Sequence, residues 1–153
     1  MSIDNRYPNL TEGALWLDLL ERYRPERRTG GLLALHRRAI PAPLDLGAPR
    51  RLEVGFGETV TVDPAQRATV ATIEVRPSLL GRLAGFLYKP APLTLAVSFA
   101  DGGERRYRFL SGLGASGFVL SPIVDNATEF ELLSDGAAPP PDRVMTGLSL
   151  IHI

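Results

Sequence analysis

Proline and glycine set the tightest limit on what this chain can fold into. Its 153 residues include 15 glycines and 13 prolines. These residues weaken or break helices, and one of them interrupts the sequence about every ten residues. A parallel α/β sheet would also need helices alternating with the strands, which the pattern does not provide. The sequence therefore predicts a mostly β fold, a two-sheet antiparallel β-sandwich of the jelly-roll kind, with one N-terminal amphipathic helix.

That helix is expected from Glu12 to about Tyr23, with Thr11 as its N-terminal cap and Pro25 beyond its end. One side of it carries an apolar stripe formed by Leu15, Trp16, Leu19, Leu20 and Tyr23. Such a stripe must be covered by other apolar groups. We therefore expect residues 1–30 to be a helical lead-in packed on the sandwich, and residues 31–153 to be the sandwich domain.

The clearest strand pattern is a hairpin. Apolar residues alternate from Leu93 to Phe99, Asp101-Gly102-Gly103 suits a tight turn, and the return strand runs to Phe109. Further short strands are expected at 32–35, 52–62, 71–75, 118–120, 128–132 and 144–153, with loose helical turns at 78–88. The predicted core positions are Leu93, Leu95, Val97, Phe99, Tyr107, Phe109, Phe130 and Leu132.

Charge and cysteine content exclude several kinds of function. Lys+Arg and Asp+Glu are equal at 17 each, so the chain lacks the basic excess typical of nucleic-acid-binding domains. There are no cysteines, which excludes disulfides, thiolate catalysis and cysteine-ligated zinc. No run of about 18 apolar residues occurs, so the sequence predicts no transmembrane span.

One glycine pattern resembles a nucleotide-binding motif. Residues 112–117, Gly-Leu-Gly-Ala-Ser-Gly, match G-x-G-x-x-G. That motif needs a helix directly after the glycines to meet the pyrophosphate, and Pro122 disfavours a helix here. We predict a glycine-rich turn between strands that binds no nucleotide, and the sequence implies no cofactor.

Catalytic signals are weak. His36 and His152 have no recognisable local partner, and no His/Asp/Glu spacing resembles a metal-ligand set. A carboxylate pair of the kind used in glycoside hydrolysis could come from any two strands, and the candidates include Asp125, Glu129 and Glu131. Glu129 and Glu131 are expected to share the solvent face of one strand, where charge is common. As aromatic platforms for a sugar, Tyr7 and Tyr88 are free candidates. The sequence therefore identifies no catalytic, cofactor or metal residues.

A basic segment follows the expected helix. It is formed by Arg22, Arg24, Arg27, Arg28, Arg37 and Arg38. The segment could be a solvated helix end, where cations suit the helix dipole, or could contact anionic lipid headgroups or a neighbouring domain. The residues expected at a membrane surface are Arg24, Arg27 and Arg28. Both interpretations remain open at this point.

Several stretches together resemble the C-terminal end of uncharacterised polytopic bacterial membrane proteins that are glycosyltransferase-like. They are Tyr7-Pro8, Tyr23-Arg24-Pro25, residues 31–38, residues 76–83, residues 87–90, Tyr107-Arg108-Phe109 and residues 117–122. The resemblance implies an extracytoplasmic domain at the bacterial inner membrane. The membrane spans of such proteins, where their activity would lie, are missing from this sequence, so no functional residue is carried over.

Two functions are compatible with these observations. The first is a non-catalytic accessory domain that binds a glycan or a lipid-linked saccharide, or packs on its own membrane-spanning region. The second is a small independent carbohydrate-active enzyme.

Overall fold

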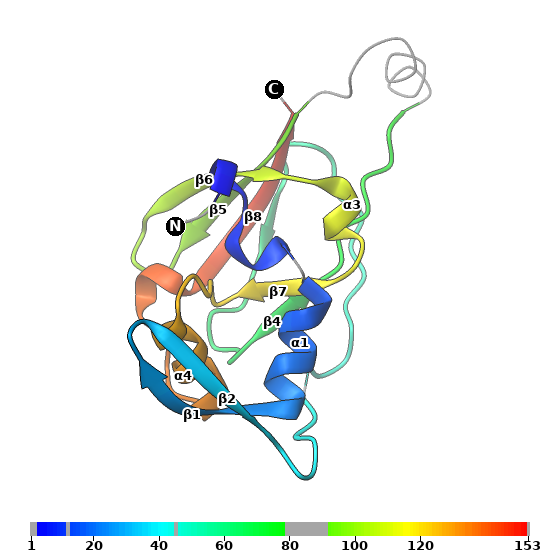
Figure 1. Cartoon of the computed structure of the whole chain (residues 1–153). Coiled ribbons are helices and arrows are strands. Elements are labelled where there is room, and N and C mark those ends of the chain that lie inside the picture. Colours follow the sequence, from blue (N-terminus) through cyan, green and yellow to red (C-terminus); the bar gives the residue numbers. More distant parts are fainter. Residues whose placement is uncertain (1–2, 12, 45, 79–91, 153) are drawn as a thin grey trace.

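The computed structural model describes residues 3–11, 13–44, 46–78 and 92–152. Within them the chain is mostly β, with eight strands in three antiparallel sheets and few helices (Figure 1). The largest sheet has the order β3-β8-β5-β6, formed by Thr59–Thr61, Met145–His152, Leu93–Phe99 and Glu104–Phe109. The other sheets are the β1–β2 hairpin, Tyr23–Thr29 and Leu32–Arg37, and the β4–β7 pair, Thr69–Ala71 and Phe118–Ser121. The mostly β prediction is confirmed, but the described strands form three sheets rather than two.

The strand β7 lies between two apolar clusters. All four of its residues are buried. Phe118 and Leu120 belong to the cluster under the four-stranded sheet, whereas Val119 belongs to a second cluster on the opposite side. Alternate side chains of a strand point to opposite faces. A strand that is buried on both faces therefore has a continuous apolar sequence, as in Phe118-Val119-Leu120.

The first cluster is the main core. The predicted hairpin is confirmed as β5–β6, in which Leu95 pairs with Tyr107 and Leu93 with Phe109, so the predicted core residues share one face. Of the predicted core positions on this hairpin, Leu93 is half-buried and Leu95, Val97, Phe99, Tyr107 and Phe109 are buried. The closing strand predicted at 144–153 is confirmed as β8, which pairs with β5.

Two buried polar side chains anchor the N-terminal segment in this core. Tyr7 is fully buried, stands edge-on to Tyr107 at 5.3 Å between ring centroids, and donates its hydroxyl hydrogen to the Leu120 carbonyl. Asn9 donates to the carbonyls of Val119 at 2.8 Å and Pro122 at 3.0 Å. Its side-chain oxygen accepts from the Val124 amide at 3.0 Å. Each bond joins a buried side chain to the backbone of a buried residue, where a polar group without a partner would be costly.

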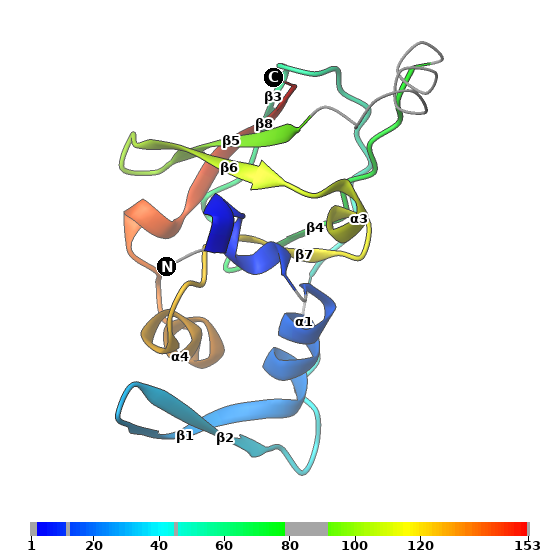
Figure 2. The same cartoon turned by 45° about the horizontal axis from the view of Figure 1, so that its top comes forward.

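The second cluster is enclosed by helices α1, Gly13–Arg22, and α4, Ala127–Asp135, together with the β1–β2 hairpin. Figure 2 shows both helices between that hairpin and the β4–β7 pair. Its buried members are Leu20, Val119, Val124, Phe130 and Leu133.

The N-terminal helix is confirmed, with a different buried side. Leu20 is buried and Trp16 and Leu19 are half-buried, but Leu15 is 47% exposed and Tyr23 already belongs to β1. The reason lies at Gly13, where an added Cβ would stand 2.3 Å from the Gly117 carbonyl oxygen and 2.6 Å from the Phe118 Cβ. The first turn of α1 thus rests on the backbone around β7, which sets the side that is buried.

The strand predicted at 128–132 is wrong, because these residues lie in α4. Asn126 caps the helix, its side chain accepting from the Glu129 amide at 3.1 Å, and Gly136 ends it with φ 75°. Phe130 and Leu133, spaced as on one helical face, are the buried residues, while Leu132 is half-buried. The capping signals at both ends override the alternation of Thr128, Phe130 and Leu132.

Other expectations also change. Residues 23–29 of the expected helical lead-in form β1. The alternation of Leu52, Val54 and Phe56 gives no strand there, and these side chains are 44–54% exposed. Alternation of apolar and polar residues gives a segment two different faces, but a strand also needs a neighbouring strand to pair with. The helical turns expected at 78–88 fall almost wholly outside the described residues.

Candidate ligand-binding site

The three arginines expected to act together lie on different faces of the β1–β2 hairpin. Cross-strand partners share a face. Arg24 pairs with His36 and Arg27 with Ala34 on the outer face, whereas Arg28 pairs with Leu33 on the inner face. A bulge between Pro25 and Arg27 shifts the register, so Arg24 and Arg27 share a face although they are an odd number of residues apart. Arg28 reaches Glu131 of α4 at 2.5 Å, which makes it a tie between hairpin and helix.

The glycine motif is structural in this fold. Residues Ser111–Gly114 form the short helix α3, and the strand β7, not a helix, follows the last glycine. Gly114 is packed so tightly that a Cβ would stand 2.3 Å from Phe109 Cζ. Gly117 has φ 81°, which favours glycine. Close packing at Gly114 and the positive φ at Gly117 explain why glycine stands at these two positions, without a bound ligand.

The candidate carboxylates are bonded to other groups. Glu129 is mostly buried, accepts from Arg143 at 2.7 Å and from the Asp125 amide at 2.6 Å. Glu131 is paired with Arg28. They lie on α4, so the expectation that both share the solvent face of a strand is wrong.

The two histidines lie on strands of different sheets. His36 lies 3.8 Å from Glu26 on the exposed outer face of the hairpin, and His152 ends β8. Within the described ranges, no cluster of three or more His, Cys, Asp or Glu side chains could hold a metal ion.

The sequence offered two tyrosines as aromatic platforms for a sugar, Tyr7 and Tyr88. Tyr7 is fully buried, so it is no platform. Tyr88 lies outside the described residues. Trp16, which the sequence assigned only to the apolar stripe, is half-buried beside Phe130, with ring centroids 5.8 Å apart.

These two rings line a cleft of about 540 Å³ that the sequence did not reveal. The inner face of the hairpin contributes Leu33 and Leu35 to its lining, and α1 and α4 contribute Leu19 and Ala127. Arg6, Thr11, Asp125 and Asn126 add polar groups, and the full lining comprises Arg6, Tyr7, Pro8, Thr11, Trp16, Leu19, Leu33, Leu35, Val124, Asp125, Asn126, Ala127 and Phe130. A mostly apolar hollow of this size with a few polar groups is typical of small-molecule sites.

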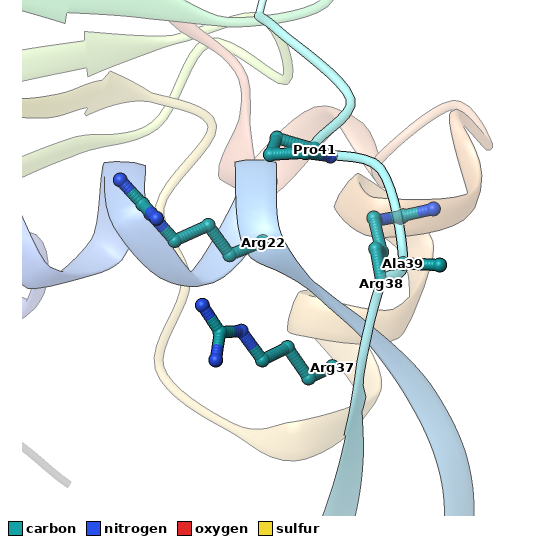
Figure 3. Close-up of a pocket in the computed structure, with 5 residues that line it drawn as sticks. All are labelled: Arg22, Arg37, Arg38, Ala39 and Pro41. Carbon is teal, nitrogen blue, oxygen red and sulfur yellow. The ribbon is translucent and has the colours of Figure 1, made fainter.

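A second hollow of about 370 Å³ lies where α1 ends and β2 leads into the following loop. It is lined by Arg22, Arg37, Arg38, Ala39 and Pro41 (Figure 3). Arg22 bonds Asp18 through Nε at 2.5 Å, and Arg38 donates from Nε to the Tyr23 carbonyl at 3.0 Å. Among the described residues, no carboxylate lies within ion-pair distance of Arg37.

The cleft could not be found from the sequence, since it joins α1 and β2 to α4, which lies much later in the chain. The arginines of the second hollow belong to one basic segment of the sequence, but charge alone does not show that they line a hollow. The nearest signals are the alternation of Leu33, Leu35 and Arg37 and the three-residue spacing of Trp16, Leu19 and Arg22.

Comparisons with protein-family models, with curated proteins and with solved structures find no match. In the part of the chain that the structure describes, no helix is long and apolar enough to cross a membrane.

Proposed function

We propose that this chain is a non-catalytic accessory domain of a bacterial membrane protein, on the extracytoplasmic face of the inner membrane, and that it binds a lipid-linked saccharide. The single observation that carries this proposal is the cleft between α1, α4 and the β1–β2 hairpin, with its mostly apolar lining and a few polar groups.

The lining suits an amphiphile better than a free sugar. Leu19, Leu33 and Leu35 offer apolar contact without hydrogen bonds, while Thr11 and Asn126 offer polar groups. Burying apolar surface stabilises a complex by roughly 25 cal/mol per Å². A saccharide carried on a lipid presents both kinds of surface to such a cleft.

The alternative is a small carbohydrate-active enzyme. Hydrolysis of a glycosidic bond needs two carboxyl groups facing each other across the substrate. Glu129 and Glu131 are instead bonded to Arg143 and Arg28, which favours a binding role.

We infer a sandwich-like arrangement for the fold that holds the cleft. It is supported by the main cluster, in which residues of β5, β6 and β8 pack against Phe118 and Leu120 of β7. A jelly-roll strand order would be the finer form of this proposal.

The test of function uses calorimetry with two sets of probes. These are free cell-envelope oligosaccharides and the same saccharides joined through phosphate to a short prenyl chain. We expect the lipid-linked forms to bind, and Leu19→Gln, which places an amide in the cleft, to weaken them at least tenfold. Leu15→Gln is the matched control, because Leu15 lies on the same helix and does not line the cleft. Equal affinity of the two variants, or tighter binding of the free saccharides, would contradict the proposal.

A further inference from the structure

The apolar cleft and the arginine-lined hollow lie on the same faces of the same two elements. On β2, Leu33, Leu35 and Arg37 alternate along the inner face of the hairpin. On α1, Trp16, Leu19 and Arg22 follow at three-residue spacing, which places them on one side of the helix. Both elements therefore lead from the cleft to the arginines.

The separation between the two hollows is short. Three residues of helix rise about 4.5 Å, and two residues of strand about 6.6 Å. Arg22 and Arg37 point toward the same side of the helix end, while Arg38 points the other way (Figure 3). Two long guanidinium side chains are thus available directly beyond the end of the cleft.

Local carboxylates offset only part of the charge of these arginines, because Arg22 is paired with Asp18 whereas Arg37 has no described carboxylate within ion-pair distance. Asp18 bonds Arg22 only through Nε, so the Nη groups of Arg22 make no bond to the described residues. The C-terminal carbonyls of α1 would repel an anion, but those of Glu21 and Arg22 accept hydrogen bonds from the amides of Ala42 and Arg38. Paired guanidinium groups are well suited to bind phosphate oxygens.

We propose that the cleft and the arginine hollow form one bipartite site for a lipid phosphate. The chain lies in the cleft and the phosphate lies between Arg22 and Arg37. This inference rests on the proposed function for the use of the cleft, and adds the group that the arginines recognise.

The test uses octyl phosphate, octyl glucoside and inorganic phosphate, each titrated against the whole chain. Trp16 is the only tryptophan and lines the cleft, so its fluorescence reports occupancy. We expect Arg37→Gln to weaken octyl phosphate binding about tenfold, as loss of a charge-assisted hydrogen bond predicts. Octyl glucoside binding should stay within twofold. Arg24→Gln, which removes the same charge from the outer face of the hairpin, is the matched control and should leave both unchanged.

The outcomes separate the two proposals. If octyl phosphate binds Arg37→Gln and Arg24→Gln equally, the phosphate site is wrong, although cleft binding that Leu19→Gln weakens would still stand. If inorganic phosphate binds as tightly as octyl phosphate and Leu19→Gln has no effect, the arginines form a separate anion site and the bipartite proposal is overturned. If octyl phosphate binds through Arg37 while no lipid-linked saccharide binds, the bipartite site stands and the saccharide function fails.

Discussion

Gly112 and Gly114 stand two residues apart in one motif, yet their surroundings differ completely. An added Cβ at Gly114 would collide with the Phe109 ring and lie 3.1 Å from the Ile73 carbonyl oxygen, whereas at Gly112 it would meet nothing within 4 Å. Gly114→Ala should lower the free energy of unfolding by about 1–3 kcal/mol through overpacking. Gly112→Ala should be neutral or slightly stabilising, because alanine is the better helix former. Urea unfolding of the two variants measures this difference, and equal stabilities would contradict the packing role.

Tyr7 makes stability depend on alkaline pH. Burial, and to a smaller degree the nearby Tyr107, raise the pKa of Tyr7 well above its ordinary value. The phenol ionises more readily in the unfolded chain than in the folded one. The contribution of Tyr7 to the free energy of unfolding is therefore complete below about pH 10 and is lost as the pH rises above that value. Tyr7→Phe should therefore flatten the fall in the urea midpoint between about pH 9 and 11. A fall as steep as in the unsubstituted chain would show that Tyr7 is not the group responsible.

Burial of Tyr7 and Asn9 could not be predicted from the sequence. Their bonds reach Leu120, Val119 and Val124, more than a hundred residues away. A local pattern contains no information about such partners, and Tyr-Pro-Asn near a chain end is equally compatible with an exposed turn.

At the scale of elements, the sequence succeeded where one pattern dominates and failed where two compete. The β5–β6 hairpin has both strict alternation and a turn signal, and the hairpin is confirmed. Around Phe130, a short alternation competed with the spacing of Asn126, Glu129 and Gly136, which are the caps of α4. Weighing those caps would have predicted the helix from the sequence alone.

The caps of α4 give a prediction that separates helix from strand. Asn126→Ala should cost about 1 kcal/mol of unfolding free energy, because the Glu129 amide loses its partner. Thr128→Ala, at an exposed position of the first turn, should change stability by less than about 0.5 kcal/mol. If residues 128–132 formed a strand, Thr128→Ala would be the more destabilising of the two substitutions, since threonine is the better strand former. Thermal unfolding of both variants decides between the two.

At the scale of the whole molecule, the outer face of the β1–β2 hairpin is exposed and open to a neighbouring surface. Arg24 and Arg27 share its outer face, while Arg28 is held by Glu131. The membrane-contact hypothesis therefore narrows to the first two arginines, each of which would contribute about 1 kcal/mol toward anionic lipid.

Sedimentation with anionic and neutral vesicles tests this prediction. Arg24→Gln/Arg27→Gln should lose binding to anionic vesicles, and added salt should weaken binding of the unsubstituted chain. Arg106→Gln/Arg108→Gln removes two charges from the exposed side of β6 and should keep most of the binding. Equal loss in the two double variants would indicate a net-charge effect rather than a contact by the hairpin.

The cleft is the central claim, and amide chemical shifts recorded during titration with a short prenyl-phosphate-linked saccharide test it most directly. We predict that the largest shifts fall on the Trp16 indole N–H and on the amides of Leu19, Leu33, Leu35 and Phe130, where α1, α4 and the β1–β2 hairpin meet. Residues of β3 and β6, which do not line the cleft, should stay unchanged. Shifts concentrated on the four-stranded sheet, or none at saturating ligand, would contradict the account.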